Sequence, residues 1–79
     1  MSVGTTKELG MVIRARRKEL GITQKDLALT CGTGLRFIVD LEKGKLTCQI
    51  GKTLNVLQSL GLAVEIAALG RADIGGGRP

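Results

Sequence analysis

Residues 21–45 have the sequence GITQKDLALTCGTGLRFIVDLEKGK, which predicts two short helices joined by a tight turn. Thr23 can cap the first helix, and the Gly32–Gly34 run breaks it. The second helix is predicted from about Leu35 to Lys43, with Gly44 just beyond its end. Two short helices connected in this way are typical of a helix-turn-helix, which places its second helix in the major groove of DNA.

Helices are also predicted on both sides of this segment. Thr5 or Thr6 can cap a helix before it, and Thr47 can cap a helix after it that ends at about Leu60. In each helix the recurrence of apolar residues every three or four positions defines an inward face. The residues predicted to face inward are Leu9, Ile13, Arg17 and Leu20; Leu27, Ala28 and Cys31; Ile38 and Leu41; and Ile50, Leu54 and Leu57.

The last predicted element is a short strand over residues 62–69. Leu62, Val64 and Ile66 alternate with other residues, and a period of two is typical of a strand. A lone strand leaves its backbone groups unpaired, and the sequence predicts no other strand. The simplest partner is the same strand of a second subunit across a twofold axis, so these three residues are the predicted dimerisation contacts. The alternative is that the fourth helix continues past Gly61.

The length and composition favour one small, mainly α domain that shares its stability with a second copy. The chain has 79 residues, of which 43% are apolar but only 1% (Phe37) aromatic. A domain of this size buries a small share of its surface, so dimerisation would stabilise it. The predicted organisation is a flexible start at 1–5, a helix-turn-helix domain at 6–61, the dimerisation strand at 62–69 and a flexible tail at 70–79.

The charge of the chain favours a polyanionic partner. Lys and Arg number 12 against 7 Asp and Glu, which gives a net charge of +5 and a pI near 9.8. That sign suits DNA, RNA or an anionic membrane surface. A basic protein without any such partner is the plainer alternative.

Several other classes of protein are not indicated by the sequence. It has no His and no CxxC spacing, so we expect no metal site, and Cys31 and Cys48 are predicted to be small core or half-buried residues. It also lacks a membrane-length apolar stretch and the apolar run of a signal peptide, so a cytoplasmic protein with reduced thiols is expected. No acid–base pair or phosphate-binding glycine loop points to an enzyme or to a cofactor.

Arg17 is the unusual residue of the predicted inward faces. A buried guanidinium needs a carboxylate partner, because an unpaired charge in the core is very costly. Glu42, next to Leu41 near the end of the third helix, is the best candidate. We therefore predict an Arg17–Glu42 ion pair that joins the first helix to the third. The alternative is an Arg17 stem that lies along the core edge with its charged head in water.

The exposed positions of the third helix and its approach are the candidate DNA contacts. Arg36 has the strongest base-reading chemistry, because its guanidinium matches O6 and N7 of guanine. Asp40 would repel phosphate, so its expected role is to accept from cytosine or to orient Arg36. An ordinary solvated side chain is the alternative at each position. The predicted base contacts are Gly34, Leu35, Arg36, Val39 and Asp40, and the predicted phosphate contacts are Gln24, Thr33, Lys43 and Lys45. Arg14, Arg16 and Lys18 are predicted to form a basic cluster on the first helix.

These residues resemble a known superfamily over about residues 8–60. The helix-turn-helix of the Cro/CI (XRE) repressors is similar at Gly21-Ile22-Thr23-Gln24, Leu27-Ala28, Gly32, Ile38, Leu41-Glu42 and Gly44. A more particular resemblance is to HipB-type antitoxins. It includes Arg36-Phe37-Ile38, Asp40-Leu41-Glu42, Gly44-Lys45, Thr47, Leu54, Val56-Leu57 and Leu60-Gly61-Leu62. The turn departs from the family pattern, which often has Val-Ser where this chain has Thr33-Gly34.

The resemblance implies a four-to-five-helix Cro/CI-type domain whose C-terminal strands pair in a homodimer. It also implies binding to an inverted-repeat operator of the chain's own operon, and a complex with a HipA-like serine/threonine kinase toxin. Two alternatives remain at this stage. One is a stand-alone or phage-type regulator without a toxin, and the other is a protein-interaction module that has lost DNA binding.

Overall fold

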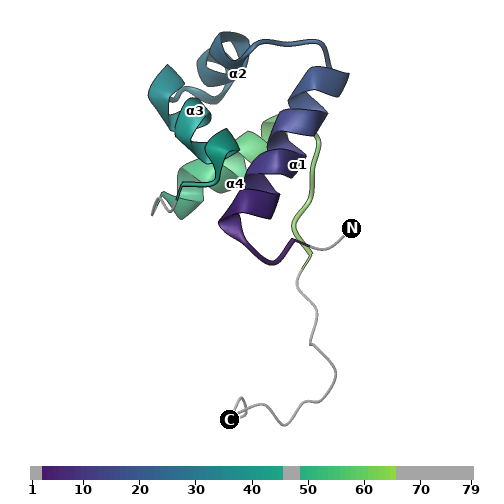
Figure 1. Ribbon diagram of the computed structural model, residues 1–79. Coiled ribbons are helices and arrows are strands. Elements are labelled where there is room, and N and C mark those ends of the chain that lie inside the picture. Colours follow the sequence, from purple (N-terminus) through teal and green to yellow (C-terminus); the bar gives the residue numbers. More distant parts are fainter. Residues whose placement is uncertain (1–2, 46–48, 66–79) are drawn as a thin grey trace, which may run out of the picture.

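The computed structural model describes residues 3–45 and 49–65, which fold into four helices (Figure 1). They are α1 (Thr6–Glu19), α2 (Gln24–Cys31), α3 (Leu35–Lys43) and α4 (Ile50–Ser59). Within these two ranges there is no strand. The prediction of a mainly α fold is therefore confirmed, and none of the described helices is long and apolar enough to cross a membrane.

The first two helices begin at the caps that the sequence predicts. The Thr5 hydroxyl accepts the Glu8 backbone N–H at 3.1 Å, and the Glu8 carboxylate accepts the Gly4 N–H at 2.7 Å. In α2 the exchange between Thr23 and Asp26 is reciprocal, with bonds of 3.0 and 3.1 Å. The bonds at Thr5, Thr23 and Asp26 each satisfy an N–H that the start of a helix leaves without a partner, and the Gly4 bond ties the preceding residue to the first turn of α1.

Two glycines allow α1 to approach the end of α3 closely. A Cβ on Gly10 would lie 2.5 Å from the Leu41 carbonyl oxygen, and one on Gly44 would lie 2.6 Å from the Lys7 Cα. Gly44 also has a backbone φ of 81°, a conformation that residues with a Cβ rarely adopt. Thr6 donates its hydroxyl proton to the Gly44 carbonyl at 2.8 Å. These contacts fix the position of α3 relative to α1.

The core draws on all four helices. Its most deeply buried side chains are Ile13 from α1, Leu27 from α2, Ile38 from α3, and Val56 and Leu60 at α4. Cys31 is buried beside them, as predicted, whereas Cys48 lies outside the described residues. The Asn55 amide of α4 donates to the Cys31 carbonyl at 2.9 Å and so closes the end of α2. The predicted inward faces of α2 and α3 are confirmed.

The inward face of α4 differs from the predicted one. Leu57 is buried, but Ile50 is 70% exposed and Leu54 is 41% exposed, and the helix instead buries Thr53 and Val56. The sequence has two apolar stripes on this helix, and spacing alone does not say which stripe packs inside one chain. Ile50 and Leu54 therefore form an outward apolar face.

Two further predictions about helix ends are wrong. Leu20 was expected on the inner stripe of α1, but it is the C-cap and is 44% exposed, because the helix ends before the next inward position. The N-cap of α4 is Gln49 rather than Thr47, and it forms no side-chain cap bond. A side-chain cap is worth only about 1 kcal/mol, so a capping residue in the sequence does not by itself fix where a helix starts.

The chain turns at Gly61 and leaves α4. Leu62 donates its N–H to the Leu57 carbonyl at 2.8 Å and is half-buried against the core. Residues 62–65 are neither helix nor strand, so the alternative of a longer fourth helix is wrong for them, and the predicted strand is not seen at Leu62 or Val64. The rest of the predicted strand, including Ile66, and the predicted tail at 70–79 lie outside the described residues.

Candidate nucleic-acid interface

A tight turn joins α2 to α3. Gly32 has φ of 70°, and Thr33 donates its N–H to the Ala28 carbonyl at 3.0 Å, which ends α2. Gly34 is the N-cap of α3 and supplies no side-chain cap bond. A serine at this position could cap the helix through its hydroxyl. With Gly34 there, the first amides of α3 have no side-chain partner. They are consequently available to water or to a phosphate.

The candidate base contacts lie along one side of α3. Gly34, Leu35 and Arg36 are exposed, and Val39 and Asp40 are half-buried. Phe37 packs against the core and is also half-buried. The structure therefore brings all five predicted base-contacting residues onto the outer side of one helix and its cap.

Asp40 links two of the candidate DNA contacts. Its Oδ1 lies 3.3 Å from Nε of Arg36 and 3.7 Å from Nζ of Lys45. The same oxygen is buried and accepts no well-directed hydrogen bond among the described residues. The attraction between these groups is therefore mainly Coulombic. Of the two roles predicted for Asp40, this geometry matches orientation of Arg36.

The Arg17–Glu42 ion pair predicted from the sequence is present. Arg17 donates from Nε at 2.7 Å and from Nη2 at 3.1 Å to the two carboxylate oxygens, and from Nη1 to the Ile22 carbonyl at 2.8 Å. The side chains are only 10% and 3% exposed. The hydrogen bond to Glu42 raises the pKa of Arg17 above its ordinary value, against the opposing effect of burial. The pair joins α1 to α3 directly behind the outer face.

Gln24, a predicted phosphate contact, is turned toward this ion pair. Its amide nitrogen donates to the Glu42 Oε1 at 3.0 Å, and the side chain is half-buried. A side-chain amide has two N–H groups, so the second remains for a phosphate. The structure thus couples the start of α2 to the Arg17–Glu42 pair, which the sequence pattern did not reveal.

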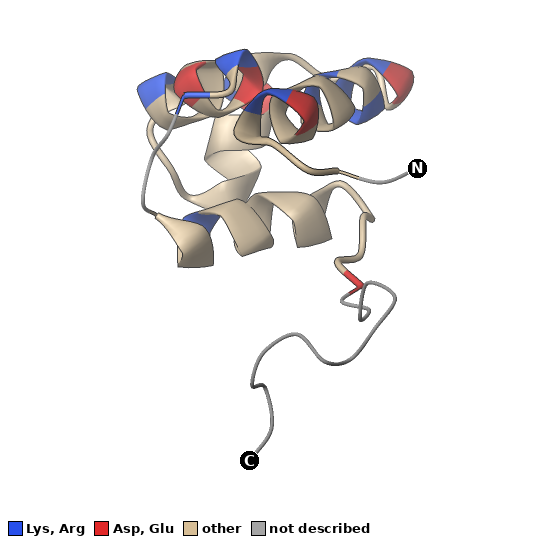
Figure 2. Cartoon of the chain, turned by 60° about the horizontal axis from the view of Figure 1, so that its bottom comes forward, with Lys and Arg blue, Asp and Glu red and all other residues tan. Residues whose placement is uncertain are grey.

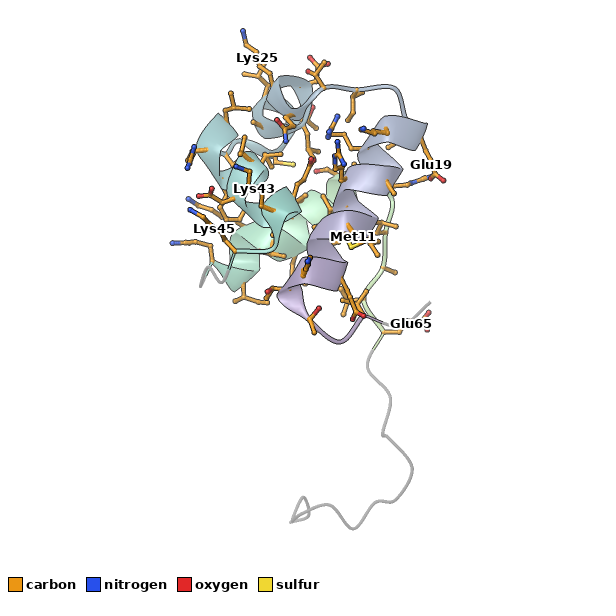
Figure 3. The ribbon with its side chains drawn as sticks, in the orientation of Figure 1. Met11, Glu19, Lys25, Lys43, Lys45 and Glu65 are labelled. Atoms are coloured by element: carbon orange, nitrogen blue, oxygen red, sulfur yellow. The ribbon has the colours of Figure 1, made fainter. Side chains whose placement is uncertain are left out.

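Basic side chains stand at both ends of the α2–α3 unit. Figure 3 shows Lys25 at α2 and Lys43 and Lys45 at the end of α3, on the side away from Met11, Glu19 and Glu65. Thr33, the remaining predicted phosphate contact, is half-buried, and its hydroxyl lies 3.3 Å from the Gly34 carbonyl.

One basic residue near α3 was not among the contacts predicted from the sequence. Lys52, in the first turn of α4, places its Nζ 5.7 Å from the centre of the Phe37 ring. This distance fits a cation–π contact. The only signal in the sequence was a lysine early in a helix, and spacing does not show that this helix begins beside α3.

The predicted basic cluster on α1 is divided. Arg14 and Lys18 are exposed, but Arg16 donates from Nε to the Leu60 carbonyl at 2.9 Å and pairs with Glu19 at 3.3 Å. Residues two apart on a helix point in different directions, which explains the division. Figure 2 shows that charged residues gather on α1, α2 and α3, whereas Lys52 is the single charged residue of α4.

Comparisons with known proteins agree with this geometry. A sequence model of the family described as "Helix-turn-helix" matches residues 13–48. The chain is 52% identical over 68 residues to an uncharacterized HTH-type transcriptional regulator, y4mF, of Sinorhizobium fredii (strain NBRC 101917 / NGR234), and the match covers 86% of this chain and 90% of the relative. Among solved structures, a chain titled "MDT Protein" superimposes with a TM-score of 0.78 over 86% of this chain and 96% of its own length. Its sequence identity is 22%, so this likeness concerns the fold alone.

Proposed function

Because the chain belongs to the helix-turn-helix transcriptional regulators of the Cro/CI (XRE) type, we propose that it is a sequence-specific repressor that binds operator DNA as a homodimer. The observation that best supports this role is the outer side of α3. Arg36 is 74% exposed there, and Lys43 and Lys45 stand at the end of the same helix. A helix with this pattern suits the major groove, with the lysines on the flanking phosphates.

The phosphate contacts would surround α3 on more than one side. Lys43 and Lys45 follow α3, Lys52 comes from α4, and Gln24 and the amides of the Gly34 turn complete the approach. Each neutralised phosphate releases counterions, so affinity should fall steeply with salt. The base contacts in this proposal are Gly34, Leu35, Arg36 and Val39, and Asp40 either accepts from cytosine or orients Arg36.

The homodimer is supported by the outward face of α4. Ile50 and Leu54 are one turn apart and exposed, and Val64 beyond the helix is also exposed. Two copies of a chain with a net charge of +5 repel each other least where they present uncharged surface. We therefore propose that α4 and the segment 62–69, through Leu62, Val64 and Ile66, form the dimer interface. A twofold dimer would place its α3 helices roughly 34 Å apart, so it would bind an inverted repeat.

A finer proposal is that the protein is the antitoxin of a HipBA-like system. Its support is the resemblance of Arg36–Lys45 and of Leu54–Leu62 to HipB-type antitoxins. In this role the protein represses its own operon, binds a HipA-like kinase toxin and acts by binding rather than by catalysis, without a cofactor. The proposal includes a cytoplasmic, nucleoid-associated location. A stand-alone or phage-type XRE regulator is the alternative, and a protein-interaction module without DNA binding is a more distant one.

The DNA-binding proposal is tested on the region upstream of the chain's own gene. Fluorescence anisotropy at moderate salt should give a tighter dissociation constant for that fragment than for a scrambled fragment of equal length. A plot of log affinity against log salt should have a steep negative slope. Equal affinity for the two fragments would contradict a sequence-specific repressor, and no binding to either would favour the interaction module.

The antitoxin proposal is tested through the neighbouring gene. A kinase-like reading frame in the same operon should yield a product that co-purifies with this chain and loses toxicity when the two are co-expressed. If operator binding is intact but the neighbouring product neither co-purifies nor is neutralised, the stand-alone regulator is the correct description.

A further inference from the structure

We propose that Asp40 is a positioning residue that presents Arg36 to a guanine of the operator. This assignment rests on the proposed function, because it assumes that α3 contacts bases. Asp40 follows Arg36 by one helical turn, so both side chains lie on the same side of α3.

The contact leaves one edge of the guanidinium free. Asp40 Oδ1 lies 3.3 Å from Nε of Arg36, while the Arg36 side chain is 74% exposed. The two terminal nitrogens of the guanidinium carry parallel N–H groups on the edge that faces away from Nε. That edge can donate to both O6 and N7 of guanine. A flexible arginine held in this way loses less conformational freedom when it binds.

Asp40 is itself held from the other side. The Lys45 N–H donates to the Asp40 carbonyl at 3.0 Å, and the Lys45 ammonium lies 3.7 Å from Oδ1. The Asp40 side chain is only 20% exposed, and its Oδ1 is buried without a well-directed hydrogen bond. The carboxylate is therefore fixed between two cations and has little freedom to reach a cytosine by itself.

A carboxylate beside DNA has an opposing effect on affinity. Its negative charge repels phosphates, so it weakens binding to every sequence equally. The presence of this carboxylate on α3 is consistent with a role in discrimination between base pairs. Removal of this charge should consequently raise affinity for unrelated DNA while it lowers the preference for the correct base pair. A residue that only stabilises the fold would not separate these two quantities.

The test measures both quantities in Asp40→Asn. Dissociation constants are measured for the bound promoter fragment, for a scrambled fragment, and for fragments in which each base pair is substituted in turn. We expect affinity for scrambled DNA to rise by about twofold, because one repulsive charge is lost. Discrimination should fall by about threefold to tenfold at the single base pair that Arg36→Ala also affects. In the Arg36→Ala background, Asp40→Asn should change that discrimination no further.

Two controls separate this effect from general charge and from folding. Glu19→Gln removes the same charge from α1, where its side chain is 67% exposed, and should leave discrimination at every base pair unchanged. Asp40→Glu keeps a carboxylate and should retain part of the discrimination. Thermal melting of each variant identifies any that has lost its fold. If Asp40→Asn does not fold, the discrimination between base pairs is compared for Asp40→Glu and the wild type instead.

The outcomes distinguish failure of this assignment from failure of the proposed function. If the wild type does not prefer the promoter fragment, the proposed function fails, and the assignment to Asp40 fails with it. If the wild type prefers it but Asp40→Asn keeps full discrimination, only the assignment to Asp40 is wrong. If Asp40→Asn and Arg36→Ala affect different base pairs, Asp40 contacts a base directly and is not a positioning residue.

Discussion

The outer faces of α3 and α4 differ in kind, although the helices have nearly equal lengths of 9 and 10 residues. On α3, Arg36 and Lys43 are exposed around a half-buried Asp40. On α4, Ile50 and Leu54 are exposed, and there is one charged residue in the whole helix. A charged face suits a polyanion, whereas an exposed apolar face suits another protein surface. The contrast therefore favours separate surfaces for DNA and for a second copy.

The two helices are also held in place by different forces. Behind α3 lies the Arg17–Glu42 ion pair, and the Gly10 backbone packs closely against the end of the helix. Behind α4 the contacts are mainly apolar, through Val56 and Leu57. The loss of a buried charge should consequently affect the fold through α3, whereas changes to the outer face of α4 should affect assembly and leave the fold intact.

The largest effect is expected from Glu42→Gln, which leaves the buried Arg17 charge without a counterion. Removal of one partner of a buried ion pair costs about 3–5 kcal/mol. For a domain of this size, even the lower figure lowers the melting midpoint by about 12–24 °C. Thermal unfolding followed by circular dichroism measures this change. Glu19→Gln, which breaks the exposed Arg16–Glu19 pair, should change the free energy of unfolding by less than about 1 kcal/mol. Equal effects of the two substitutions would mean that the buried pair does not stabilise α3.

The next largest effect is expected from Leu54→Glu on the outer face of α4. A charge placed in the proposed dimer interface should give a folded monomer, because Leu54 lies outside the core. Operator affinity should fall by about 100-fold or more, since binding of the second half-site is no longer intramolecular. Sedimentation velocity and anisotropy measure the two changes. Leu29→Glu makes the same change at an exposed leucine of α2 and should leave the oligomeric state unaltered. A dimer that survives Leu54→Glu would remove α4 from the interface.

A smaller effect is expected when single proposed DNA contacts on α3 are removed. Arg36→Ala should cost about 1–3 kcal/mol of operator binding and relax specificity at one base pair. Lys43→Ala should weaken binding to all sequences similarly and reduce the salt slope by about one. Anisotropy titrations over a range of salt concentrations separate these two behaviours. If Arg36→Ala also weakens binding to all DNA sequences equally, Arg36 contacts a phosphate. The charged face of α3 would then contribute to DNA affinity but not to sequence specificity.

The sequence predicted the local features of the α3 side of this comparison well. Thr23 with Asp26 specified the start of α2, and Gly44 specified the end of α3, because caps depend on residues close together in the chain. The Arg17–Glu42 pair was also predictable, although the two residues are 25 positions apart in the chain. A buried arginine needs a carboxylate partner, and Glu42 lies next to the inward-facing Leu41.

The α4 side was predicted less well, because it depends on contacts between distant segments. Ile50 and Leu54 fit an inward stripe as well as Val56 does, and only the packing of α4 against α2 decides between them. The approach of Lys52 to Phe37 and the turning of Gln24 toward Glu42 are likewise properties of the assembled fold. Spacing within one helix does not contain this information.

The smallest effect is expected from pH, through the capping box that begins α2. The Thr23 backbone N–H donates to the Asp26 carboxylate, which holds the pKa of Asp26 below its ordinary value. A lowered pKa in the folded chain means that the ionised group stabilises the fold above its ordinary pKa. This contribution is lost as the pH falls through the lowered pKa. Asp26→Asn should therefore lower the melting midpoint at neutral pH, and the gap from the wild type should narrow as the solution is acidified below about pH 4. Melting curves at neutral and acid pH measure the gap, and a gap that widens on acidification would show that the carboxylate does not stabilise the start of α2. Gln24 of α2 donates a hydrogen bond to Glu42 of α3, so a stable start of α2 also supports α3. A narrowing gap would therefore show that the proposed DNA-contacting side depends on the exposed cap of α2 as well as on the buried Arg17–Glu42 pair.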